Sequence, residues 1–230
     1  MAQPELGTVL VTGGSSGLGA AVAHAVAAAG GLPVVLDRTA PPFEVDHELV
    51  DLADTRAAEA AVGRAAERHA GLDAVVTCAG IDTPGALGEV PAETWERVVL
   101  VNLLGTAAAV RAALPYLERS GGRVVTIAST LGLRALGDAT AYCASKFGVV
   151  GFTRALAAET AGRIGVSLIV PGGMHTAFFD GRDEQYRPGP DARLNRPEDV
   201  AEAVLFVLRQ PPGCEVRELL VAPATESSWP

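Results

Sequence analysis

Short apolar segments alternate along the 230-residue chain with longer alanine-rich amphipathic segments, and this alternation limits the possible fold more than any other feature. Seven apolar or β-branched segments are expected to be strands: 8–12, 33–36, 49–50, 73–77, 122–128, 166–170 and 218–221. Helices are expected over 18–29, over 54–69, as a pair within 91–120 with the second starting near Val101, over 142–162 and over 197–210. Strands that are apolar throughout are buried on both faces. The pattern therefore predicts an α/β fold, with a doubly wound parallel β-sheet flanked by helices on both faces.

The whole chain, residues 1–230, is expected to form a single domain. Hydrophobic residues make up 49% of it, which is enough for a sizeable core. No internal repeat, linker or change in composition divides it. One crossover looks too short for a helix, because the span from Asp37 to Asp51 contains Pro41-Pro42 and a crossover with its helix needs about 10–12 residues. A loop or a single turn is expected there.

Charge and cysteine content exclude several classes of protein. A net charge of −9 argues against nucleic acid or an anionic membrane as a general partner. No apolar run reaches the length of a membrane span, and the first residues lack the features of a signal peptide. The three widely spaced cysteines are expected to be free thiols, which predicts a cytoplasmic location. No metal is expected, because the histidines form no spaced ligand set: His24, His47, His69 and His175.

A glycine-rich loop lies directly between the first expected strand and the first expected helix, over residues 12–19. Such a loop allows backbone N–H groups to approach a pyrophosphate, and the start of the helix adds a partial positive charge. Glycines also remove the Cβ atoms that would block this approach. The alternative is a glycine-rich turn without a ligand. The interpretation adopted is a dinucleotide site that includes Gly13, Ser15, Ser16, Gly17, Leu18 and Gly19.

Asp37 closes the second expected strand about twenty residues after the loop, which is the usual spacing for a ribose-binding carboxylate. A carboxylate there can accept hydrogen bonds from the ribose hydroxyls of NAD and would repel the 2′-phosphate of NADP. The neighbouring Arg38 points the other way, because a guanidinium could bind that phosphate. We expect NAD as the cofactor, with NADP as the alternative. Asp37 could also be an ordinary strand-end residue that pairs with Arg38.

Lys146 is the only lysine among eighteen basic residues, and it follows Tyr142 by four positions. Residues with this spacing share one helix face. A nearby ammonium, together with a positively charged nicotinamide, would lower the phenol pKa from its ordinary value of about 10. Tyr142 could then act as a general acid and base. Chance proximity is the alternative interpretation.

Two further polar residues are candidates for the same site. Ser129 ends the strand before Tyr142, at the strand end where α/β sheets carry their sites. It would hydrogen-bond the substrate oxygen. Asn102 lies in the middle of an apolar helical stretch, where asparagine is unfavourable without another role. It would hold the helix open for a proton-relay water.

Taken together, these motifs resemble those of the short-chain dehydrogenase/reductase family over nearly the whole chain. The family's Asn-Ser-Tyr-Lys tetrad corresponds to Asn102, Ser129, Tyr142 and Lys146, and its glycine loop to residues 12–19. The resemblance implies a Rossmann-type fold, with a cofactor half at about 1–120 and a catalytic and substrate half at about 121–230. It also implies a homotetramer or homodimer that assembles through the helices carrying Asn102 and Tyr142.

The resemblance adds further cofactor-binding candidates to Asp37 and Arg38. They are Asp51, Leu52, Cys78, Ala79, Gly80, Pro171, Gly172 and Thr176, with Tyr142 and Lys146 also touching the cofactor. One motif departs from the family pattern: Thr77-Cys78-Ala79-Gly80 stands where Asn-Asn-Ala-Gly is frequent. The threonine changes the hydrogen bonding expected around the fourth strand.

The expected function is hydride transfer between NAD(H) and a secondary alcohol or ketone, such as a small hydroxy acid. One alternative is an NADP-dependent ketoreductase of a secondary-metabolite pathway. A second is a regulatory protein that binds the nicotinamide nucleotide without turnover, although an intact tetrad argues against it. The expected partner is a small molecule, with neither nucleic acid nor membrane involved.

Overall fold

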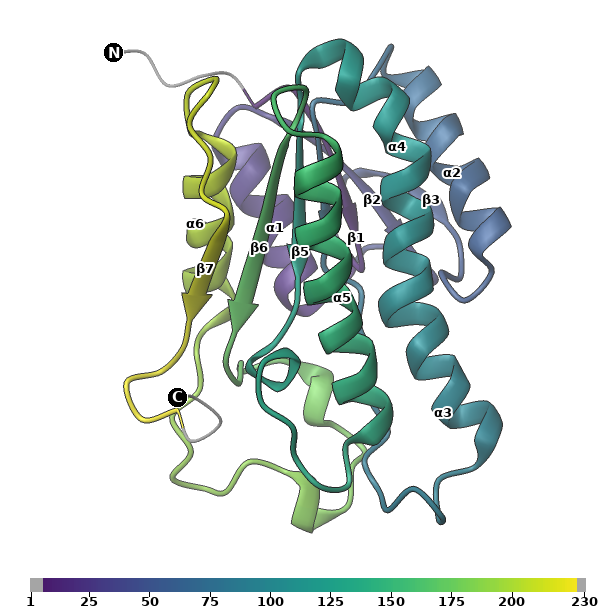
Figure 1. Cartoon of the computed structure of the whole chain (residues 1–230), viewed down its shortest axis with the longest axis vertical. Coiled ribbons are helices and arrows are strands. Elements are labelled where there is room, and N and C mark those ends of the chain that lie inside the picture. Colours follow the sequence, from purple (N-terminus) through teal and green to yellow (C-terminus); the bar gives the residue numbers. More distant parts are fainter. Residues whose placement is uncertain (1–5, 227–230) are drawn as a thin grey trace.

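The computed structural model describes residues 6–226, and a single sheet of seven parallel strands runs through them (Figure 1). The order across the sheet is β3-β2-β1-β4-β5-β6-β7. The strands are β1 (Thr8–Thr12), β2 (Leu32–Asp37), β3 (Asp46–Leu49), β4 (Ala74–Thr77), β5 (Arg123–Ile127), β6 (Gly165–Pro171) and β7 (Glu218–Val221). The α/β fold with a parallel sheet is therefore confirmed.

Helices cover both faces of the sheet (Figure 1). They are α1 (Gly17–Ala28), α2 (Thr55–Arg68), α3 (Ala92–Val99), α4 (Thr106–Ser120), α5 (Thr140–Glu159) and α6 (Pro197–Leu208). One face carries α1 and α6, whose valines pack on Val9, Val11 and Val76 of the central strands. The other face carries α2, α4 and α5 over Leu10, Val75 and Val124. The same strands are thus buried on both sides, which explains why they lack hydrophobic–polar alternation.

The segment from Ala92 to Ser120 corrects the expectation of two helices. Helices α3 and α4 are joined without a break by a π-helical turn, Leu100–Gly105, instead of by a loop. Wide turns of this kind occur mostly as single turns within α-helices, frequently at functional sites. Asn102 lies within this turn.

The third strand begins earlier in the chain than expected. It spans Asp46–Leu49, not Leu49–Val50, and pairs in parallel with β2 at the edge of the sheet. Its charged residues are held from the neighbouring helix: Arg68 of α2 lies 2.8 Å from Asp46 and 2.7 Å from Glu48. The expectation that no helix forms between Asp37 and Asp51 is confirmed.

We expected no apolar segment long enough to span a membrane, and the helical span Ala92–Ser120 corrects this expectation. By length and composition alone, this one helix among the described residues could cross a membrane. Half of its most apolar window is buried inside the protein, and the core helix of a soluble protein passes the same test. The finding therefore carries no argument for a membrane.

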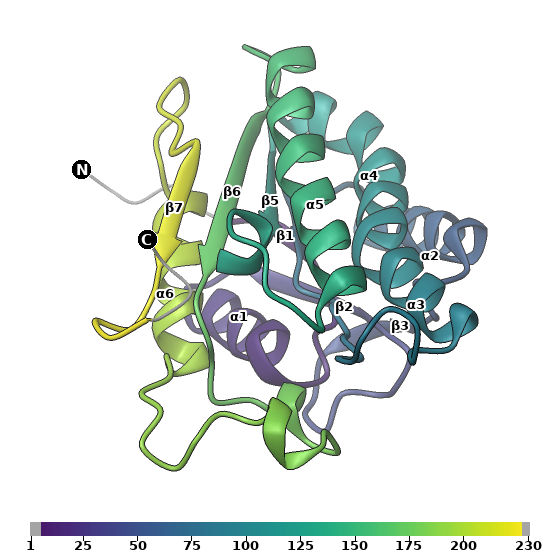
Figure 2. The same ribbon diagram turned by 60° about the horizontal axis from the view of Figure 1, so that its bottom comes forward.

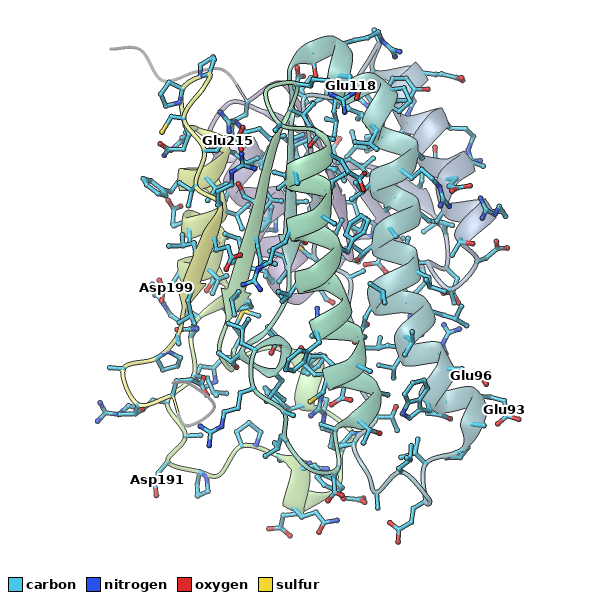
Figure 3. All side chains as sticks on the ribbon, viewed as in Figure 1. Glu93, Glu96, Glu118, Asp191, Asp199 and Glu215 are labelled. Atoms are coloured by element: carbon cyan, nitrogen blue, oxygen red, sulfur yellow. The ribbon has the colours of Figure 1, made fainter. Side chains whose placement is uncertain are left out.

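The carboxyl ends of all seven strands lie at one end of the molecule, which comes forward in Figure 2. Strand β1 has β2 on one side and β4 on the other, so the winding of the sheet reverses at this point. Open α/β sheets bind ligands in the crevice outside such a reversal. The acidic side chains labelled in Figure 3 are spread over different parts of the molecule, and among them Asp191 lies at this same end.

Candidate functional site

A cavity of about 680 Å³ opens at this end of the sheet, between the segments that follow β1, β2, β4, β5 and β6. Its size lies within the usual range for small-molecule sites, about 300–1,000 Å³. Of the twenty residues expected at the site, eighteen line this cavity: Gly13, Ser16, Gly17, Leu18, Gly19, Asp37, Arg38, Asp51, Leu52, Cys78, Ala79, Gly80, Ser129, Tyr142, Lys146, Pro171, Gly172 and Thr176. The two exceptions are Ser15 and Asn102.

The glycine loop forms a cradle that only glycine allows. Gly13 has a φ of +69°, and a Cβ there would lie 2.6 Å from the Ala79 Cα. A Cβ at Gly19 would overlap the carbonyl oxygen of Gly13. Helix α1 begins at Gly17, so its unpaired N–H groups and the positive end of its dipole face the loop. This loop can receive an anionic group such as a pyrophosphate.

The carboxylate of Asp37 lies beside the loop at the end of β2. It accepts hydrogen bonds from the backbone N–H of Ser15 at 3.0 Å and from that of Thr39 at 3.1 Å. Ser15 does not line the cavity, and its assignment as a cofactor contact stays a prediction. Its hydroxyl donates instead to the Thr39 carbonyl at 2.6 Å, and this bond ties the loop to the segment after β2. Arg38 is exposed at the rim of the cavity.

Asp51 lines the same part of the cavity and is paired. Its carboxylate accepts a hydrogen bond from Arg97 at 2.7 Å and another from the Ala53 N–H at 2.9 Å. The Arg97 hydrogen bond is the largest cause of a lowered pKa at Asp51. Arg97 itself lines the cavity and was missed in the sequence, where it resembles any exposed helical arginine.

Ser129 and Tyr142 meet at the other end of the cavity. Ser129 follows β5, and its oxygen accepts a hydrogen bond from the Leu131 N–H at 3.1 Å, which fixes its orientation. It also hydrogen-bonds the Tyr142 hydroxyl. Burial raises the pKa of Tyr142 to about 12, and the Ser129 hydrogen bond opposes that rise. The phenol of the polypeptide alone therefore stays protonated at neutral pH.

Lys146 is 4% exposed, one helical turn from Tyr142 on α5. Its Nζ donates a hydrogen bond to the Ile127 carbonyl at 2.9 Å and lies 5.7 Å from the centroid of the Tyr142 ring. Burial lowers the pKa of Lys146 to about 8. The charges that act most strongly on the Tyr142 pKa are those of Asp82 and Arg182. The expected lowering of that pKa is thus not a property of the polypeptide by itself, because burial outweighs it.

Asn102 is completely buried and outside the cavity. Its amide donates to the Ile81 carbonyl at 2.8 Å and to the Ser145 hydroxyl at 3.1 Å, and its Oδ1 accepts from the Ile81 N–H at 2.8 Å. These bonds join the π-helical turn to the loop after β4 and to α5. Asn102 is therefore a positioning residue in this structure.

The unusual Thr77 has a structural consequence. Its buried hydroxyl has no hydrogen-bond partner among residues 6–226. Next to it, burial raises the pKa of the Cys78 thiol to about 12, which keeps Cys78 protonated although it lies near Lys146. All three cysteines are free, as expected.

Several cavity residues had no motif to reveal them. Asp82 comes two residues after Gly80, and Arg182 lies in the segment after β6, where its guanidinium sits 4.5 Å from the centroid of Phe178 and 4.9 Å from that of Phe179. Asp82 and Arg182 lie 3.3 Å apart, between Nη2 and Oδ2. The only available signal was that they lie in the segments that follow strands β4 and β6.

The residues present fit a dinucleotide. The glycine cradle suits a pyrophosphate and Asp37 suits a ribose, while Thr176, whose methyl lies near Gly17, lines the same cavity. Among residues 6–226, no three His, Cys, Asp or Glu side chains gather as a metal site would require. The fold and site together define a nucleotide-binding α/β oxidoreductase.

The family follows from the sequence comparison. The model of the short chain dehydrogenase family matches residues 7–187, so the chain belongs to that family. A cis-4-hydroxycyclohexanecarboxylate dehydrogenase of Sinomonas cyclohexanicum is 33% identical over 217 residues, 86% of this chain and 87% of that protein. A D-threitol dehydrogenase of Mycolicibacterium smegmatis is 34% identical over 218 residues, 86% of this chain and 84% of that protein.

One further relative is much longer than this chain, and one solved structure has the same fold. The chain spans only 19% of a glycine betaine reductase of Emericella nidulans, to which it is 32% identical over 94% of its own length. The crystal structure of an alcohol dehydrogenase from Thermococcus sibiricus, complexed with 5-hydroxy-NADP, superposes with a TM-score of 0.84 at 25% identity. That match covers 93% of this chain and 95% of the other.

Proposed function

We propose that this protein is an NAD(H)-dependent oxidoreductase that interconverts a secondary alcohol and its ketone. One observation carries the proposal: Ser129, Tyr142 and Lys146 line the same cavity as the glycine cradle. A hydroxylated substrate held against Ser129 and Tyr142 would thus lie in one space with a dinucleotide bound at the loop. The related dehydrogenases that act on D-threitol and cis-4-hydroxycyclohexanecarboxylate support an alcohol as the substrate.

The glycine loop and Asp37 would hold NAD⁺, which would supply the acceptor for the hydride of the carbinol carbon. With a positively charged nicotinamide beside it, Tyr142 would lose its proton and, as a phenolate, take the proton of the substrate hydroxyl as the general base; it would return this proton in the reverse reaction. Ser129 holds the substrate oxygen by a hydrogen bond. Lys146 contributes a positive charge one helical turn away, and its position is fixed by the Ile127 carbonyl. Asn102 keeps the loop after β4 in place through Ile81.

The preference for NAD over NADP rests on Asp37. Its carboxylate lines the cavity and would repel a 2′-phosphate, whereas Arg38 at the rim is the residue that favours NADP. The Thermococcus sibiricus relative was crystallised with an NADP derivative, which keeps the alternative of an NADP-dependent ketoreductase worth measuring. Titrations of the protein with NADH and with NADPH test the cofactor preference. We expect the lower Kd for NADH, and tighter binding of NADPH would overturn the preference for NAD.

A homotetramer or homodimer, assembled through the helices that carry Asn102 and Tyr142, is part of the proposal. Two large apolar side chains on these helices support it: Leu104 is 45% exposed and Phe147 is 43% exposed. Analytical ultracentrifugation tests it, and a monomer at micromolar concentration would contradict it. A cytoplasmic location is also proposed, and cell fractionation tests it.

The activity itself is tested with a panel of secondary alcohols, hydroxy acids and ketones, followed by nicotinamide absorbance. We expect turnover of at least one member, and its loss in Tyr142→Phe with NADH binding unchanged. NADH binding without any turnover would instead favour the regulatory alternative. Tyr116→Phe is the matched control, because Tyr116 lies on α4 outside the cavity.

A further inference from the structure

Asp82 and Arg182 form a charged pair inside the cavity, at the end where Tyr142 lies. Their side chains are 5% and 11% exposed, and both charges act on the Tyr142 hydroxyl. Asp82 follows the loop that Asn102 holds, whereas Arg182 comes from the segment after β6. Two segments that are a hundred positions apart therefore place opposite charges beside the proposed reacting position.

The pair leaves hydrogen-bonding groups unused. The Nη2 of Arg182 lies 3.3 Å from the Oδ2 of Asp82 but is not aligned for a hydrogen bond. In the described part of the chain, Asp82 Oδ1 and Arg182 Nε and Nη2 are buried without any hydrogen-bond partner. Each such group costs about 1–3 kcal/mol when it stays unsatisfied. A purely structural ion pair would instead be expected to align its donors and acceptors.

The chemistry of the unused groups limits what can satisfy them. An acceptor and two donors stand side by side, and a hydroxyl group both donates and accepts. A carboxylate would gain from Arg182 but would meet the charge of Asp82, and an ammonium would meet Arg182. The pair is neutral as a unit, which favours an uncharged ligand. Phe178 and Phe179 hold the guanidinium over their rings and cover the apolar side of the same space.

We propose that Asp82 and Arg182 bind a second hydroxyl of the substrate, so that this protein acts on vicinal diols, polyols or the matching hydroxy ketones. The proposal rests on the proposed function, because it takes the reacting hydroxyl to lie at Ser129 and Tyr142. Asp82 accepts the proton of the neighbouring hydroxyl, and Arg182 donates to its oxygen. Simple alcohols would leave both groups unsatisfied in a closed site, which lowers their reactivity.

Three four-carbon substrates separate the possibilities: 2,3-butanediol, 2-butanol and 3-hydroxybutyrate, each with NAD⁺. Satisfying one or two buried polar groups predicts that kcat/KM for the diol exceeds that for 2-butanol by about tenfold to a hundredfold. In Arg182→Met and Asp82→Asn this ratio should fall to within about threefold of one. The ratio does not depend on the fraction of folded enzyme. Arg193→Met, in the exposed part of the same segment, is the matched control and should keep the ratio.

Thermal unfolding with each compound, with and without NADH, gives a readout besides turnover. We expect 2,3-butanediol to raise the Tm of the wild type more than 2-butanol does, and this difference to vanish in Arg182→Met. Equal Tm shifts and equal kcat/KM values for 2,3-butanediol and 2-butanol would overturn the inference. A preference for 3-hydroxybutyrate that depends on Arg182 would also overturn it. If NADH does not change the Tm of the wild type, the proposed function is contradicted instead. Failure of the proposed function is thus distinguishable from failure of the diol inference.

Discussion

Replacing Lys146 with methionine is expected to stabilise the protein while removing its activity. Lys146 is 4% exposed, and burial lowers its pKa from 10.5 to about 8. The ammonium therefore destabilises the folded state whenever it is protonated. Methionine has a similar length and carries no charge.

The pKa shift determines the size of the effect. At about 1.4 kcal/mol per pKa unit, the fall from 10.5 to about 8 corresponds to about 3 kcal/mol. The hydrogen bond from Nζ to the Ile127 carbonyl is lost in the variant, at a cost of about 1 kcal/mol. A net gain of about 2 kcal/mol in the free energy of unfolding is expected below pH 8.

The pH dependence follows from the direction of the shift. Between pH 8 and pH 10.5 the unfolded chain binds a proton at Lys146 that the folded protein has lost. The wild type therefore gains stability as the pH rises through this window, and the advantage of the variant disappears. Lys146 is the only lysine, so no other lysine titrates in this range.

Urea unfolding of the wild type and Lys146→Met, at neutral pH and at steps up to the end of this window, measures the difference. Turnover in the same preparations should be lost in the variant. A variant less stable than the wild type at neutral pH would refute the reasoning. So would a stability difference that does not change with pH.

Four further outcomes are expected. Tyr142→Phe should lower kcat about a hundredfold or more, as loss of a general base does, with the Kd for NADH unchanged by fluorescence titration. Gly13→Ala should weaken NADH binding and lower the Tm, because its left-handed φ of +69° alone costs about 1–2 kcal/mol; an unchanged Kd would contradict the cradle. Asn102→Ala should lower the free energy of unfolding by about 3 kcal/mol, since both Ile81 backbone groups lose their partner; urea unfolding checks this. Lys146→Arg keeps the charge but overfills a buried site, so a loss of about 1–3 kcal/mol and of most turnover is expected; near-normal kcat would refute it.

The glycine loop and Asp37 could be predicted because their signals are local. Residues 8–19 contain a buried strand, a glycine-rich turn and the start of a helix without a gap. The backbone geometry of the loop therefore depends on neighbouring residues alone. Strand β3 could not be predicted in the same way. Three of its four residues, Asp46, His47 and Glu48, are polar, and it forms a strand through pairing with β2 and ion pairs from Arg64 and Arg68.

The tetrad shows the same division. The spacing of Tyr142 and Lys146 predicted that they share a helix face, and Ser129 joins them because parallel strands end at one edge. The role of Asn102 depended on contacts with Ile81 and Ser145, which lie 21 and 43 positions away. Those contacts explain the continuous helix with a π-helical turn, where a local pattern suggested two helices.

The sequence by itself determined the parallel α/β sheet, the glycine loop and the family, because each depends on periodicity or on motifs of neighbouring residues. Only the tertiary structure decided the electrostatics of the site. Burial, a property of the packed fold, raises the pKa of Tyr142 where the sequence predicted a lowering, and it lowers the pKa of Lys146. The unsatisfied pair of Asp82 and Arg182 likewise exists only once two distant loops meet.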